Sequence, residues 1–82
     1  MIILDVYVPA VDKTYNFSLN EDVDIGTIVA EITEMIEQRE KMKYAGNIAD
    51  LNLFSSKSEN ALPKKNSLSD CYITSGSRLI LI

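Results

Sequence analysis

The last fifteen residues of the chain carry the most information about its fold. They read Leu68-Ser69-Asp70-Cys71-Tyr72-Ile73-Thr74-Ser75-Gly76-Ser77-Arg78-Leu79-Ile80-Leu81-Ile82. The pattern predicts a Leu-Ser-Asp turn, a buried apolar pair, a turn at Gly76 and a closing apolar strand from Arg78 to Ile82. A single helical or 3₁₀ turn is expected from Ser67 to Cys71.

The opposite end of the chain begins with a second apolar strand pattern, from Ile2 to Val8. Its even-numbered residues are all apolar and fall on one face. Pro9 and Asp12 then favour a turn, and residues 14–19 alternate as a second strand, so that the two segments predict a hairpin. The first and last strands are the most apolar ones, as central strands of a sheet require.

A segment with the apolar periodicity of an α-helix follows the hairpin. Apolar residues recur at helical spacing at Ile25, Ile28, Val29, Ile32 and Ile36. Asp24 is suited to cap the helix start, because its carboxylate accepts unpaired backbone N–H groups of the first turn. We expect the helix to run from about Ile25 to about Tyr44, with Gly46 in the left-handed position after its end.

The remaining sequence predicts short strands and turns. Leu51–Phe54 is expected to form a third strand, residues 55–60 a polar loop and residues 61–63 a very short edge strand. The order strand–strand–helix–strand–strand–strand predicts an α+β fold, in which a mixed sheet of four or five strands packs on one long helix. Residues 1–82 are expected to form one domain.

Composition and charge exclude several classes of function. The net charge is −4, which disfavours nucleic-acid binding because phosphate contacts need clustered Lys and Arg. No run approaches the roughly 20 apolar residues of a membrane span, and the first residues lack the positive segment of a signal peptide. With one cysteine in the sequence, we expect a cytoplasmic protein without membrane insertion, which could still lie against a membrane complex through partners.

The residues needed for common catalytic chemistry are missing from the sequence. There is no histidine, and one cysteine cannot form a zinc cluster. We therefore expect no enzyme activity, no cofactor and no metal. Cys71 is interpreted as a small buried hydrophobe, with a redox-sensing thiol as the alternative. Met35 and Met42 are interpreted as filling the core or its edge, with an adaptable partner surface as the alternative, and the glutamates of the helix as a solvated face.

The segment from Leu68 to Leu79 resembles the end of the small bacterial YukD/EsaB proteins, which reads Leu-Ser-Asp-Cys-Gly-Ile-Thr-Asn-Gly-Asp-Arg-Leu. These are ubiquitin-like components of type VII secretion systems in Gram-positive bacteria. The chain departs from the family by lacking prolines between Lys43 and Asn47, and by carrying Tyr72 in place of a small residue.

The resemblance implies a ubiquitin-like β-grasp domain whose first and last strands pair in parallel. It also implies a non-catalytic adaptor or regulator that binds a cytosolic domain of the secretion machinery. Ubiquitin and the sulfur carriers continue past the last strand into a Gly-Gly tail, whereas the strand signal here includes Ile82, so we expect no conjugation. A carrier protein activated at its C-terminus and an unrelated β-grasp interaction module remain the alternatives.

The last strand is apolar on both faces. If Leu79 and Leu81 meet the helix, Ile80 must point the other way. Ubiquitin uses the equivalent sheet face to bind proteins, and a contiguous exposed apolar patch marks an interface. We therefore predict a protein-binding surface, which includes a possible homodimer contact, at Ile3, Tyr7, Asn52, Ile80 and Ile82.

Overall fold

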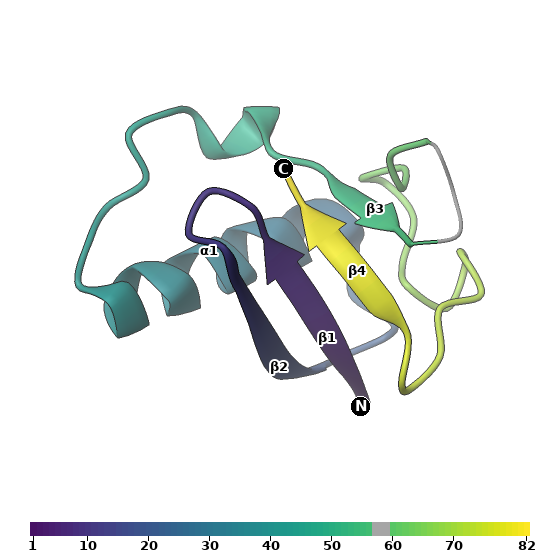
Figure 1. Ribbon diagram of the computed structural model, residues 1–82. Coiled ribbons are helices and arrows are strands. Elements are labelled where there is room, and N and C mark those ends of the chain that lie inside the picture. The colour runs from purple at the N-terminus through teal and green to yellow at the C-terminus, as the bar shows by residue number, and fades with distance from the viewer. Residues whose placement is uncertain (57–59) are drawn as a thin grey trace.

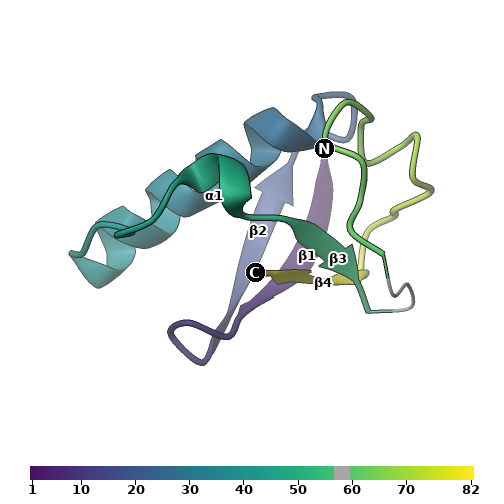
Figure 2. The same ribbon diagram turned by 90° about the horizontal axis from the view of Figure 1, so that it is seen from above.

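The computed structural model describes residues 1–56 and 60–82. Its elements, in chain order, are β1 (Ile2–Val8), β2 (Lys13–Leu19), α1 (Ile25–Glu40), the 3₁₀ helix η1 (Ile48–Asp50), β3 (Leu53–Ser55) and β4 (Arg78–Leu81). Figure 2 shows α1 lying along one side of the sheet. The predicted α+β class is confirmed, with four strands in the sheet.

The sheet has the strand order β2-β1-β4-β3. β1 pairs antiparallel with β2 and parallel with β4, and β4 pairs antiparallel with β3. The first and last strands therefore lie side by side in the centre of the sheet, as predicted (Figure 1). This position buries one face of the two most apolar strands, which is the arrangement that removes the most apolar surface from water.

One hydrophobic core fills the space between the sheet and the helix. Alternate residues of the strands and one face of α1 supply most of it: Leu4, Val6, Val8, Tyr15, Phe17, Leu19, Ile25, Ile28, Val29, Ile32, Ile36, Leu53, Leu79 and Leu81. Every apolar residue predicted on the inner face of the helix is thus buried. Met35 packs partly buried against this core, whereas Met42 is 50 % exposed, so the core-filling interpretation is wrong for Met42.

The helix begins where the sequence predicts and ends earlier. The Asp24 carboxylate accepts a hydrogen bond from the Thr27 backbone N–H at 2.9 Å, and this bond lowers the pKa of Asp24. At the other end Lys41, with φ 53°, takes the left-handed position expected at Gly46. The predicted end near Tyr44 is wrong because Glu37 binds the returning chain, accepting from Met42 N–H at its backbone carbonyl and from Tyr44 N–H at its carboxylate.

The segment after the helix differs from the predicted strands. η1 was not expected, and β3 starts at Leu53, two residues later than predicted. The expected edge strand at residues 61–63 is reduced to a single bridge between Phe54 and Ala61. Of the polar loop expected at residues 55–60, residues 57–59 lie outside the described part of the chain.

The C-terminal turn is fixed against the start of the helix. Ser67 and Asp70 bind each other's backbone, with Asp70 Oδ2 accepting from Ser67 N–H and Ser67 Oγ accepting from Asp70 N–H. Asn66 supplies a carbonyl to Ile25 N–H at 2.8 Å. Leu68 is fully buried, Ile73 is buried and Cys71 is half-buried. The turn that the sequence predicts is therefore part of the packed structure.

Candidate functional site: the outer sheet face

The outer sheet face is the side of the sheet that points away from α1. Because side chains alternate along a strand, the residues next to the buried ones point to this face. The outward-pointing residues of the four strands, together with Asn52 before β3 and Ile82 after β4, are Ile3, Asp5, Tyr7, Thr14, Asn16, Ser18, Asn52, Phe54, Arg78, Ile80 and Ile82. The face is thus polar along β2 and largely apolar along the other three strands.

Three apolar side chains form a continuous row across the outer sheet face. Tyr7 is paired with Ile80, and Ile80 is paired with Phe54. Directly opposed residues on neighbouring strands lie within side-chain contact distance. All three residues are half-buried, because each is covered only by its neighbours in the sheet. The register therefore gathers residues from three distant segments of the chain.

The row continues at the end of the sheet. Asn52 and Ile82 exchange two backbone hydrogen bonds, at 2.8 and 3.0 Å, just beyond the paired strands. Ile82 is 59 % exposed and lies on the same face as Ile80. The structure therefore brings four of the five predicted interface residues to one end of the face.

Ile3 does not join this group. It lies at the other end of β1, opposite Ser18 of β2, and is 54 % exposed. The paired residues Asp5 and Arg78 separate it from the row. Phe54, in contrast, belongs to the row and was missed. The period-two spacing from Asn52 to Phe54 would have identified it.

The Tyr7 hydroxyl is held by the hairpin loop. It donates a hydrogen bond of 2.8 Å to Asp12 Oδ1, and Asp12 has a left-handed φ of 51°. This hydrogen bond raises the pKa of Tyr7, because an ionised phenol would lose the donor and face the carboxylate. This hydrogen bond holds the Tyr7 ring, one member of the apolar row, at the end of the face nearest the hairpin loop.

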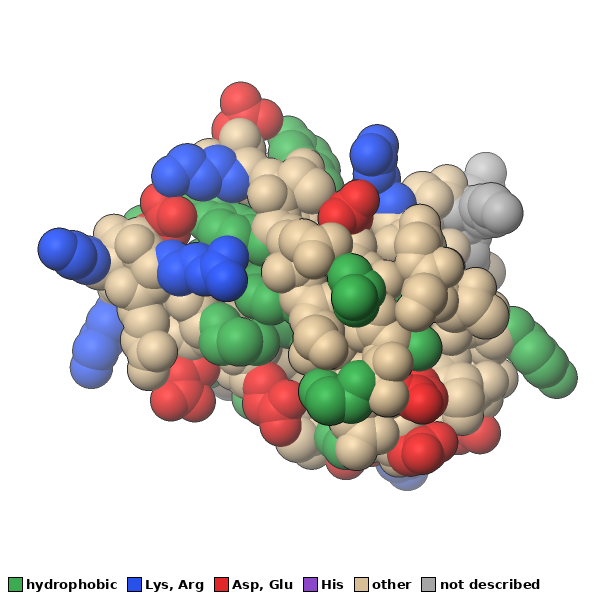
Figure 3. Space-filling view, turned by 90° about the horizontal axis from the view of Figure 1, so that it is seen from below, with side chains coloured by type: hydrophobic (Ala, Val, Ile, Leu, Met, Phe, Trp, Pro, Cys, Tyr) green, Lys and Arg blue, Asp and Glu red, His purple; other side chains and the backbone are tan. Residues whose placement is uncertain are grey.

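Charged side chains of α1 border β2 on the helix side of the sheet. Arg39 places its guanidinium 5.8 and 5.7 Å from the ring centres of Tyr15 and Phe17. Lys13 and the Tyr15 hydroxyl both donate to the Glu40 carboxylate, at 2.7 and 2.9 Å. Figure 3 shows charged side chains of both signs surrounding hydrophobic ones at the end of the molecule drawn on the left. These contacts engage Arg39 and Lys13 with groups of the protein itself.

The described residues offer no assembly for metal chemistry, since their Cys, Asp and Glu side chains form no group that could hold a metal ion. Partial burial, and then the Asp70 carboxylate, raise the pKa of Cys71 and so disfavour the thiolate. Within residues 1–56 and 60–82, both helices fall short of the length and apolar character that crossing a membrane requires.

Solved structures of similar shape identify the fold. The N-terminal ubiquitin-like domain of the 4931431F19Rik protein superposes with a TM-score of 0.75 at 20 % identity, over 99 % of this chain and 72 % of that one. The ubiquitin-like domain of the Arabidopsis thaliana protein At2g32350 gives a TM-score of 0.72 at 17 % identity, over 99 % and 74 %. The fold is the ubiquitin-like β-grasp. Neither a protein-family model nor a curated protein matches the chain.

Proposed function

We propose that this ubiquitin-like domain is a non-catalytic, non-conjugated adaptor that works by protein–protein interaction in a type VII secretion system. Its partner would be a cytosolic domain of the secretion machinery, which places the protein in the cytoplasm next to a membrane complex. The single observation that carries the interaction role is the apolar row of Tyr7, Ile80 and Phe54 on the outer sheet face. The assignment to secretion rests on the resemblance of residues 68–79 to the YukD/EsaB proteins.

The row supports binding for a physical reason. Small domains bury their large apolar side chains where they can, so a contiguous apolar group left at the surface marks a contact area. Interface cores are enriched in aromatic residues and depleted in charged ones, and this row contains two aromatic rings and an isoleucine. Asp5, Arg78 and Asn16 border it on the side of Ile3, as polar residues border the core of an interface.

The experiment is recovery of the tagged protein from its own cells under non-reducing conditions, with mass spectrometry of what accompanies it. Wild type is compared with Ile80→Asp and with Ala30→Glu, which also adds one negative charge but on the exposed side of α1. We expect non-covalent recovery of a membrane ATPase or other secretion components with wild type and Ala30→Glu, and a strong loss with Ile80→Asp.

Circular dichroism and urea unfolding of both variants provide the control for folding. Recovery of an activating enzyme, or of products linked through the Ile82 carboxylate, would instead identify a carrier protein. Equal recovery of secretion components by a folded Ile80→Asp variant would place the contact on another surface.

A further inference from the structure

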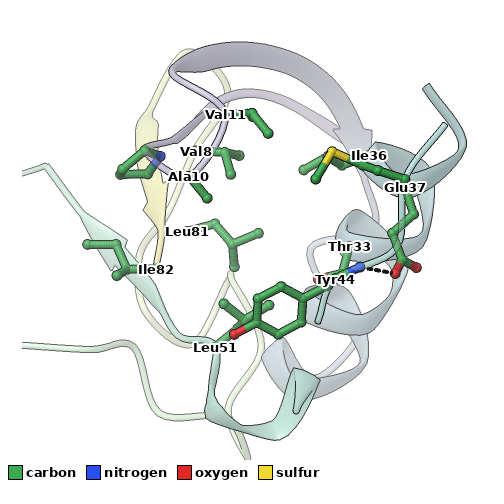
Figure 4. Close-up of a pocket in the computed structure, with 12 residues that line it drawn as sticks. Val8, Ala10, Val11, Thr33, Ile36, Glu37, Tyr44, Leu51, Leu81 and Ile82 are labelled. Carbon is green, nitrogen blue, oxygen red and sulfur yellow. Dashed lines mark hydrogen bonds between the residues drawn. The ribbon is translucent and has the colours of Figure 1, made fainter. Parts of the chain in front are cut away.

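The two edges of the sheet differ in how the chain covers them. At β3 the chain protects the edge itself, since Leu62 N–H donates to the Leu53 carbonyl at 2.8 Å. Among the described strands, none lies beyond β2 at the other edge (Figure 1). The hairpin loop before β2 packs inward, with Ala10 and Val11 directed into the hollow beside α1 (Figure 4), and not over this edge. β2 therefore forms the open edge of the sheet.

The hydrogen bonds of β1 show which backbone groups of β2 point to the open edge. Asp5 N–H donates to the Ser77 carbonyl, and the Ile3 carbonyl accepts from Gly76 N–H, so the odd-numbered residues of β1 bond toward β4. Its even-numbered residues therefore bond toward β2, and the register pairs them with odd-numbered residues of β2. The even-numbered residues of β2 are left to bond outward.

Three exposed residues carry these outward backbone groups, namely Thr14, Asn16 and Ser18. Among residues 1–56 and 60–82, no hydrogen bond joins their N–H or C=O groups to another group of the protein. β2 also lacks the features that natural proteins use to protect an edge. It contains no proline, it keeps an unbroken register with β1, and its single charged residue, Lys13, lies at its end and binds Glu40. The open edge can therefore template another strand.

The spacing of the outward-bonding residues fits a second copy of the same strand. When two β2 strands pair antiparallel about Asn16, Thr14 lies opposite Ser18 of the second copy, and the two Asn16 residues lie opposite each other. Each of these residues then exchanges two backbone hydrogen bonds with the residue opposite, so every unpaired group on the edge gains a partner. A strand of another protein would have to match this alternation, whereas a second copy supplies it by symmetry.

The side chains of β2 are also compatible with this pairing. On the helix side of the sheet, Tyr15 lies opposite Phe17 of the second copy, and cross-strand aromatic pairs stabilise a sheet. Lys13 lies opposite Leu19, so no like charges meet along the two strands. Polar residues face polar residues on the outer side for the same reason of symmetry.

We propose that two copies of this domain associate through their β2 edges, by antiparallel pairing centred on Asn16, into one sheet that joins the four strands of each copy. The two-fold axis is perpendicular to the sheet, so the apolar rows of both copies lie on the same side and stay uncovered. The pair would offer a partner two equivalent surfaces, which raises the apparent affinity for a repeated target. This consequence rests on the proposed function, whereas the association itself does not.

The first test is the concentration dependence of the isolated protein. Sedimentation equilibrium is expected to show mostly monomer at about 10 μM and a substantial fraction of dimer at about 1 mM, because a pair of strands forms a small interface and small interfaces associate weakly. In the ¹⁵N-labelled protein, the amides of Thr14, Asn16 and Ser18 are expected to shift with concentration and to exchange more slowly with solvent in the dimer. Those of Tyr15 and Phe17 bond to β1 and are expected to be protected at every concentration.

Two double variants that differ in one residue test the register. Thr14→Lys/Ser18→Lys places like charges opposite each other at both ends of the strand pair, whereas Thr14→Lys/Ser18→Glu places opposite charges there. Both positions are exposed in the monomer, and circular dichroism and urea unfolding verify that the two variants fold equally. The Lys/Lys variant is expected to dimerise about tenfold more weakly than the Lys/Glu variant.

Three results would overturn the proposal. They are a monomer at every concentration, concentration-dependent shifts confined to the outer sheet face, and equal association of the two folded double variants. Because these measurements use the isolated protein, a monomer leaves the adaptor proposal standing, and failure to recover secretion components does not affect the association.

Discussion

Two adjacent residues of β4 test the orientation of the sheet. Leu79 is fully buried between the sheet and α1, whereas Ile80 is half-buried on the outer sheet face. Replacing a buried Leu by Ala removes its packing and leaves a cavity, so Leu79→Ala is expected to lower the free energy of unfolding by about 3 kcal/mol. Ile80→Ala loses cross-strand contacts with Tyr7 and Phe54 and is expected to cost about 1 kcal/mol.

The loss expected for Leu79→Ala is a substantial part of the total free energy of unfolding. A domain of this length typically unfolds with a free energy of about 4–12 kcal/mol, so Leu79→Ala stays folded at low temperature but with a small margin. Its melting temperature is expected to fall by about 15 °C, against about 5 °C for Ile80→Ala.

Urea unfolding followed by far-UV circular dichroism and by the fluorescence of the tyrosines measures both values, with equal m-values showing that the unfolded states are comparable. A cost for Ile80→Ala equal to or above that for Leu79→Ala would refute the assigned faces. A shift of one residue in the register exchanges them, and the candidate interface would then be part of the core.

Three further predictions concern single residues. The hydrogen bonds from Lys13 and then Tyr15 lower the pKa of Glu40, so the ionised form stabilises the folded state. Above the ordinary glutamate pKa of 4.5, wild type is expected to have a larger free energy of unfolding than Glu40→Gln. This difference is lost as the pH falls through the lowered pKa of Glu40 in the folded protein. An equal difference in free energy at pH 7 and at about pH 2 would contradict this prediction. Lys41→Gly is expected to raise the free energy of unfolding by up to about 1 kcal/mol, because glycine adopts the left-handed conformation without strain, and urea unfolding showing no gain would contradict this. Because the pKa of Cys71 is raised, its reaction with a thiol reagent at pH 8 is expected to be slower in the native than in the urea-unfolded protein, whereas equal rates would restore the redox alternative.

Much of the fold was predictable because its signals are local. The spacing of Ile25, Ile28 and Ile32 requires a helix, and the alternation in residues 2–8 requires a strand with one buried face. Asp24 marks the helix start because a cap depends on residues only a few positions apart. The same parity places Ile80 on the face of the sheet opposite to Leu79 and Leu81.

The end of the helix was mispredicted for the converse reason. Gly46 is the residue that a left-handed position favours, yet Lys41 adopts that conformation. The conformational cost of a left-handed lysine is offset by the backbone carbonyl and the carboxylate of Glu37, which accept hydrogen bonds from the N–H groups of Met42 and Tyr44 after the chain has turned. The position of the helix end, at Lys41 and not near Gly46, was thus decided by contacts of the returning chain. The spacing of apolar residues in the sequence does not reveal such contacts.

The sequence by itself determined the class of the domain, most of its core residues and the side of each strand that faces water, because these follow from local periodicity and from the cost of exposing apolar surface. The tertiary structure alone decided which surface residues meet. Tyr7, Phe54 and Ile80 form a row only because β4 lies between β1 and β3. Strand order and register are non-local, since they depend on packing energies summed over the whole core, so the sites built on them appear only in the folded molecule.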